Sequence, residues 1–132
     1  MPYLLDTNIV SDIIRNPQGQ AAKRLRNVGI GQACVSLVVC AELRYGAEEK
    51  NALQLKRRVE EFLRTIRMMP LDGPADRIYA TIRVKLKREG RIIGQNDLFT
   101  AAHALALDYV LVTDNEEEFS RVPGLRIENW LR

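Results

Sequence analysis

Short apolar blocks recur along the chain, and their spacing switches repeatedly between that of a strand and that of a helix. The run Tyr3-Leu4-Leu5 predicts a short buried strand, and the stretch from Thr7 to Ile14 predicts a helix directly after it. From Ala52 to Ile66, apolar residues return every three or four positions, which is the spacing of an amphipathic helix. The same reading predicts further strands at 33–36, 68–71, 109–112 and 125–130, and further helices at 18–28, 37–48, 75–87 and 97–107.

Residues that start and stop helices support these boundaries. Ser36 and Asn96 are expected N-caps of the helices that follow them, and Gly29 and Gly90 are expected to end helices. Because strands alternate with helices, we expect an α/β fold: a mostly parallel central sheet of four to five short strands, flanked by helices on both faces. No linker or repeat interrupts the chain, so residues 1–132 are expected to form one domain.

Composition sets broad limits on the class of protein. Hydrophobic residues make up 46% and charged residues 28% of the chain, as is typical of soluble globular proteins. No apolar run approaches the roughly 20 residues that span a bilayer, and Asp6 interrupts the N-terminus too early for a secretory signal. We therefore expect a cytoplasmic protein with no membrane partner, in which Cys34 and Cys40 are reduced core residues. The net charge of +3 is compatible with a nucleic-acid partner but does not establish one.

Polar side chains are placed where the predicted strands end. Asp6 follows the first strand, Glu42 lies on the helix after the second, and Asp97 opens a later helix. Asp114 and Asn115 follow the fourth strand. Each could singly be a cap, surface or turn residue, but together they lie where open parallel sheets bind ligands, beyond the carboxyl ends of the strands. The joint placement favours an acidic site.

Such a cluster has an electrostatic cost that restricts its chemistry. Two carboxylates about 4 Å apart repel by about 4 kcal/mol at an effective dielectric constant near 20. The cluster must therefore be partly protonated or bind a cation. Carboxylate ligands without His or Cys suit Mg²⁺ or Mn²⁺, and such an ion turns bound water into a nucleophile and neutralises charge on a phosphoryl group. The pattern therefore indicates metal-dependent attack on a phosphate ester.

Other catalytic arrangements lack the residues they need. His103, the only histidine, lies in the middle of a predicted helix and is interpreted as structural. Ser36 and Thr113 have no evident histidine base, so a nucleophilic triad is not indicated, and no P-loop is present. Two alternatives to a nuclease stay open: a metal-dependent phosphatase of small phosphoesters, and a non-catalytic module that binds RNA or a partner through basic helices.

Three stretches carry a family resemblance. They read LLDTNIVSDII at 4–14, SLVVCAELRYGA at 36–47, and GRIIGQND through IENW at 90–130. In this order and spacing, which covers nearly the whole chain, they resemble the PIN domain, and closely the VapC toxins of bacterial type II toxin–antitoxin systems.

The resemblance implies roles for particular residues. Asp6, Glu42 and Asp97 correspond to the acidic core of the family, with Asp6 and Asp97 as metal ligands. Many members have an Asp two positions after the threonine that corresponds to Thr113, whereas this chain has Asn115 there and Asp114 one residue earlier. Either could supply the last polar group of the catalytic site. The residues implied to orient carboxylates or to bind phosphate are Thr7, Asn8 and Thr113.

The resemblance also implies an activity and partners. The activity is that of a Mg²⁺-dependent endoribonuclease, with Mn²⁺ as an alternative ion, that often acts on tRNA and leaves 5′-phosphate and 3′-hydroxyl ends. The partners are a second copy of the chain and a VapB-type antitoxin, which lays a segment with an Arg or Lys over the acids. A higher assembly with the antitoxin would bind operator DNA, chiefly through the antitoxin.

Overall fold

A parallel sheet organises the protein in the computed structural model, which describes residues 2–132. Its five strands lie in the order β3-β2-β1-β4-β5, and every neighbouring pair is parallel. The predicted α/β fold with a central parallel sheet is confirmed. The strand bounds are β1 (Tyr3–Leu5), β2 (Ala33–Ser36), β3 (Arg67–Met69), β4 (Val110–Val112) and β5 (Ile127–Glu128).

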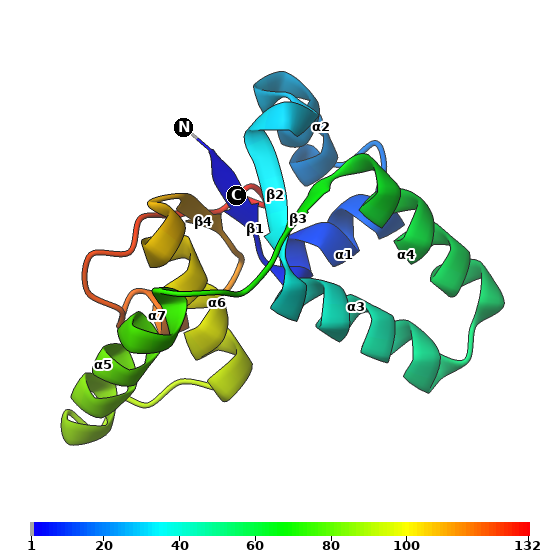
Figure 1. Cartoon of the computed structure of the whole chain (residues 1–132). Helices are drawn as coiled ribbons and strands as arrows, with labels where there is room; N and C mark the ends of the chain where they lie inside the picture. Colours follow the sequence, from blue (N-terminus) through cyan, green and yellow to red (C-terminus); the bar gives the residue numbers. More distant parts are fainter. Residues whose placement is uncertain (1) are drawn as a thin grey trace.

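Helices cover both faces of this sheet, as predicted (Figure 1). One face carries α1 (Thr7–Arg15), α2 (Gln20–Val28), α3 (Leu37–Lys50) and α4 (Leu53–Thr65), and a short 3-10 turn, η1 (Ile30–Gln32), precedes β2. The other face carries α5 (Ala75–Arg88), α6 (Gln95–Leu107) and α7 (Glu116–Phe119). Among residues 2–132, no helix is long and apolar enough to cross a membrane.

Neighbouring residues of each strand pack into different cores. Leu5 packs with α1 to α4, whereas Leu4 packs with α5 to α7. The same alternation holds for Val112 and Leu111 of β4, because successive side chains of a strand point to opposite faces. A sheet covered on both faces needs apolar residues at every position, which explains the continuous apolar runs that predicted β1 and β4.

The two cysteines belong to these cores. Both Cys34 and Cys40 are buried and free, in agreement with the prediction of reduced core residues. Burial raises the pKa of the Cys34 thiol to about 11, so the thiol stays protonated at neutral pH.

Helix caps follow the sequence at one predicted position and depart from it at another. Ser36 caps α3 as predicted, since its Oγ accepts the N–H of Val38 at 3.2 Å, and the same Oγ lies 2.8 Å from Nδ1 of the buried His103. Asn96, however, is not the N-cap of α6. The cap is Gly94, whose carbonyl accepts the N–H of Leu98 at 2.9 Å, so α6 begins before Asn96.

Two further elements differ from the sequence prediction. The third strand was predicted at 68–71 but ends at Met69, because Pro70 has no N–H to give to a strand ladder. The four-residue helix α7 was not predicted at all. It matters for the site, since it follows β4 at the edge where β1, β2 and β4 all end.

Candidate metal centre

Asp6 is held rigidly at the end of β1. Its side chain is only 4% exposed, and its Oδ1 accepts the N–H of Thr7 at 2.8 Å. Its Oδ2 accepts the hydroxyl of Thr113 at 2.8 Å and the amide of Asn8 at 3.3 Å. These bonds fix both carboxylate oxygens, so the acid at the strand tip is oriented before any ligand arrives.

Glu42 is attached to the same network by one strong contact. The hydroxyl of Thr7 donates to Oε1 of Glu42 at 2.7 Å. Glu42 lies in the second turn of α3, which packs beside α1, and its side chain is half-buried. Thr7 therefore contacts two acids at once, Asp6 through its backbone and Glu42 through its side chain.

Asp97 shows the electrostatic consequence of this gathering. Its pKa is raised from 3.8 to about 7, first by burial and then by the negative charge of Asp6. A hydrogen bond with Glu118, the charge of Glu118 and the charge of Glu42 raise it further. The pKa of Asp6 is also raised, chiefly by burial, although its bonds from Thr113 and Thr7 oppose the shift. The acids are thus close enough to disturb one another.

Glu118 on α7 is the fourth acid of this cluster, and the sequence reading missed it. Its Oε1 accepts the N–H of Gly94 at 3.0 Å, and its Oε2 accepts the side-chain amide of Asn115. Burial opposes ionisation of Glu118, but these two bonds and the one from Asp97 lower its pKa. Asp97 therefore keeps the proton of the pair, and Glu118 keeps the charge.

One signal could have pointed to Glu118. In a run of three glutamates, none stands out by composition, and such runs are usually solvated surface. The spacing Asn115-x-x-Glu118, however, is that of an N-cap and the third residue of a helix, a position from which a glutamate side chain commonly reaches back toward the N-cap. This pattern would have marked Glu118 as the glutamate that turns back toward the end of β4.

The structure separates the two candidates that follow Thr113. The exposed carboxylate of Asp114 accepts the amide of Asn129 at 3.0 Å and lies 3.7 Å from Nε of Arg132, so it turns away from the other acids. Asn115 reaches the cluster, but as the partner of Glu118, and its N–H donates to the Thr113 hydroxyl at 3.0 Å. Asp6, Glu42 and Asp97 are brought together, and Asp114 is not.

The acids of this cluster suit a cation that keeps most of its waters, rather than one surrounded entirely by protein ligands. Among residues 2–132, no three His, Cys, Asp or Glu side chains surround a common point as a ready metal-binding group. Mg²⁺ typically takes one or two protein carboxylates and keeps several waters, which needs no such cage. A hollow of about 400 Å³, lined by Glu42, Asp97 and 94–96, leaves room for the ion and its waters. Burial raises the pKa of Asp97 most, and the charges of Asp6, Glu118 and Glu42 raise it further; a cation bound here would neutralise those charges.

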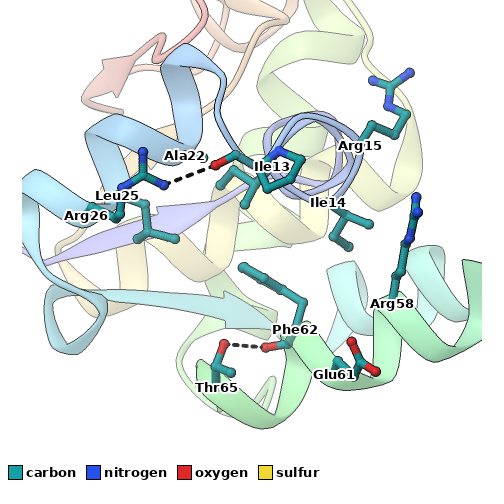
Figure 2. Close-up of a pocket in the computed structure, with 11 residues that line it drawn as sticks. Ile13, Ile14, Arg15, Ala22, Leu25, Arg26, Arg58, Glu61, Phe62 and Thr65 are labelled. Carbon is teal, nitrogen blue, oxygen red and sulfur yellow. Dashed lines mark hydrogen bonds between the residues drawn. The ribbon is translucent and has the colours of Figure 1, made fainter.

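Two grooves run beside the acids on the α1 side of the sheet. The first, here called the α3 groove, lies between α1, α3 and α4, has a volume of about 410 Å³ and begins at Thr7 and Glu42. The second, here called the α2 groove, lies between α1, α2 and α4, has a volume of about 520 Å³ and is shown in Figure 2. The two grooves share Ile14 and Arg15, so they lie next to each other along α1.

The protein is thus an α/β domain with a cluster of acids, suited to bind a cation, at the carboxyl ends of its strands. Comparisons with known proteins give its family. Residues 3–125 match the family model of the PIN domain. The chain is 36% identical over 132 residues to Ribonuclease VapC2 of Haemophilus influenzae (strain Rd) and 37% identical over 131 residues to the tRNA(fMet)-specific endonuclease VapC of Shigella flexneri. These alignments cover 99% and 98%, respectively, of both chains. The chain therefore belongs to the PIN-domain family and, within it, to the VapC ribonucleases.

A solved structure agrees with this assignment and confirms the resemblance expected from the sequence. The crystal structure of VapBC2 from Rickettsia felis, bound to a DNA fragment from its promoter, contains a chain of the same fold. The TM-score is 0.92 at 34% identity, and the match covers 98% of this chain and 99% of that one. Ribonucleases of this family generally depend on a divalent metal ion.

Proposed function

We propose that this protein is the toxin of a type II toxin–antitoxin system and hydrolyses phosphodiester bonds of RNA in the cytoplasm. The observation that carries the proposal is the convergence of Asp6, Glu42, Asp97 and Glu118 at one sheet edge, in a chain similar over its whole length to ribonucleases. The proposed ion is Mg²⁺, with Mn²⁺ as an alternative, because every donor is a carboxylate oxygen.

Asp6 and Asp97 are the proposed metal ligands. A bound ion would acidify a water and neutralise charge on the scissile phosphate. Thr7, Asn8 and Thr113 keep the Asp6 carboxylate in one orientation through three hydrogen bonds. Since the Asp97 carboxyl has a pKa of about 7 in the metal-free protein, Asp97 would have to lose this proton to bind a cation.

Glu42 and Glu118 flank these ligands from α3 and α7, with Glu42 positioned by the Thr7 hydroxyl and Glu118 by Gly94 and Asn115. Both could accept hydrogen bonds from waters around a bound ion and would in this way orient the attacking water toward phosphorus. Attack by water rather than by the ribose 2′-hydroxyl would leave 5′-phosphate and 3′-hydroxyl ends.

The proposed substrate is tRNA. One relative of 37% identity is named a tRNA(fMet)-specific endonuclease, which supports this class of RNA. The proposed partners are a second copy of the chain and a VapB-type antitoxin, through which the assembly reaches operator DNA. The VapBC complex of Rickettsia felis bound to promoter DNA supports the antitoxin and the DNA.

The α2 groove suits a segment of that antitoxin. As Figure 2 shows, Ile14 and Phe62 face its interior, whereas Arg15 and Arg58 stand at its rim. An amphipathic segment with acidic residues on its outer side would match this lining. An Arg or Lys at the end of the segment would reach the carboxylates and replace the cation electrostatically.

The activity is tested with purified protein, tRNA and Mg²⁺, with and without EDTA, and with an aryl phosphate as a second substrate. Chelator-sensitive tRNA fragments with 5′-phosphate ends support the proposal. Turnover of the aryl phosphate without RNA cleavage would favour the phosphatase alternative. RNA binding without cleavage of either substrate would favour the non-catalytic alternative.

A further inference from the structure

A glycine in the middle of α3 has no explanation within the chain itself. Gly46 lies well inside the helix Leu37–Lys50, where glycine is unfavourable relative to alanine. Its φ is not positive, so the backbone does not require glycine. A Cβ atom built on Gly46 would meet no heavy atom within 4 Å, so neighbouring side chains do not require it either. The position that a side chain of residue 46 would occupy is therefore open space.

That space belongs to the α3 groove, which Gly46 lines. The groove has a mixed lining, in which Leu43, Ala47, Leu55 and Val59 give apolar surface and the polar residues are Thr7, Asn8, Ser11, Arg15, Glu42 and Lys50. Its volume of about 410 Å³ lies within the range of small-ligand pockets, roughly 300–1,000 Å³. Apolar surface combined with polar groups that can fix the orientation of a ligand suits a molecule that is itself partly apolar and partly polar.

The position and charge of the α3 groove indicate the chemical class of the ligand that it binds. At its inner end are Thr7 and Glu42, the latter a member of the acidic cluster, so a group in the groove lies directly beside the proposed reaction centre. Arg15 and Lys50 stand along the groove and are both exposed, as cations that contact phosphates must be. The ligand is therefore apolar on its faces, polar at its edge and attached to negative charge.

From these observations, we propose that the α3 groove binds a nucleobase of the RNA next to the cleaved phosphodiester, and that Gly46 keeps the groove open for it. The inference rests on the ribonuclease function proposed above and adds a substrate subsite to it. Unpaired bases that are splayed out and enclosed by side chains are the usual means by which proteins read single-stranded RNA. Arg15 and Lys50 would hold the phosphates that flank the base.

The test fills the groove without disturbing the fold. Gly46→Leu places a side chain in the groove, whereas Gly46→Ala adds one methyl group and Glu49→Leu adds a leucine to the same helix outside either groove. We measure kcat and KM for cleavage of a tRNA and of a short oligonucleotide from its cleaved region. Thermal unfolding and Mn²⁺ affinity in the absence of RNA report on the fold and the acidic site.

Gly46→Leu is expected to raise KM at least tenfold for both RNAs, while its melting temperature and Mn²⁺ affinity equal or exceed those of the wild type. Gly46→Ala is expected to change KM less than threefold, and Glu49→Leu, which removes a negative charge beside Lys50, is expected not to raise KM. Wild-type KM in Gly46→Leu would overturn the inference but leave the ribonuclease function intact. A wild-type protein that cleaves no RNA would overturn both.

Binding of a purified cognate antitoxin tests whether the α3 groove serves that protein partner instead of RNA. If Gly46→Leu weakens antitoxin binding while RNA cleavage keeps its wild-type KM, the groove serves the protein partner and the inference is overturned. A raised KM for RNA supports the subsite whatever happens to antitoxin affinity, because an inhibitor that covers the acids can also cover this groove.

Discussion

The hydroxyl of Thr113 donates a hydrogen bond of 2.8 Å to Oδ2 of Asp6, and this bond joins the ends of β4 and β1 across 107 residues of sequence. Both side chains are buried, with Thr113 fully inaccessible. The same hydroxyl oxygen accepts the N–H of Asn115 at 3.0 Å, so it also fixes the start of the segment that carries Glu118. One buried threonine thus connects the acid at the first strand to the acid on α7.

Thr113→Val keeps the shape of this side chain but removes its donor and acceptor. A buried carboxylate oxygen then loses its closest side-chain partner, which should destabilise the protein by about 1–3 kcal/mol. Cleavage should fall by roughly 10- to 100-fold, as is usual when a group that orients a metal ligand is lost. Chemical denaturation and kcat/KM for RNA check both effects. Thr113→Ser retains the hydroxyl and should stay within a few-fold of the wild type.

Stability of the metal-free protein should fall as the pH rises from about 4 to about 7. The folded-state pKa of Asp97 is about 7 against an ordinary value of 3.8, because burial and the charge of Asp6 favour the protonated form. In this window the folded state binds the proton that the unfolded state has released, so raising the pH favours unfolding. Melting temperatures across the window, in EDTA, measure the slope.

Asp97→Asn isolates this effect. The amide cannot ionise, so the decline in stability between pH 4 and pH 7 should become shallower, and above pH 7 the variant should unfold at a higher temperature than the wild type. The same variant should lose Mg²⁺-dependent cleavage, because a proposed metal ligand is gone. An unchanged slope would show that Asp97 is not the titrating group.

Glu118 and Asp114 form a matched pair of acids that follow the same strand. Glu118→Gln should lower kcat/KM by roughly 10- to 100-fold, because Glu118 contacts Asp97 and the first turn of α6. Asp114→Asn should change kcat/KM less than threefold, since that carboxylate faces Asn129 and Arg132. Equal losses in the two variants would contradict the separation seen in the structure.

Divalent cations should stabilise the folded protein. Mg²⁺ or Mn²⁺ at about 100 times its dissociation constant adds about 2.7 kcal/mol to the free energy of unfolding, if only the folded state binds it. The melting temperature should therefore rise with cation concentration at pH 7.5 and fall back when EDTA is added. Asp6→Ala should abolish this rise, and a rise that persists in Asp6→Ala would place the cation elsewhere.

The sequence predicts a feature when residues close to it along the chain determine that feature. The strand of β1 and the cap at Ser36 follow from local apolar pattern and side-chain chemistry, and both were predicted correctly. The convergence of Asp6, Glu42 and Asp97 at one edge was predictable as well, because parallel strands all place their carboxyl ends at the same edge. These features need only the order of the elements.

Only the tertiary structure decided which acid after β4 reaches the cluster. Asp114 is nearer in sequence to the strand end, yet it turns outward to Asn129, whereas Glu118 turns inward to the N–H of Gly94. The same contact involves the residue that caps α6, where the sequence had indicated Asn96. A side chain's direction depends on partners from distant segments, Asn129 for one acid and Gly94 for the other, and the local residue pattern does not contain those partners.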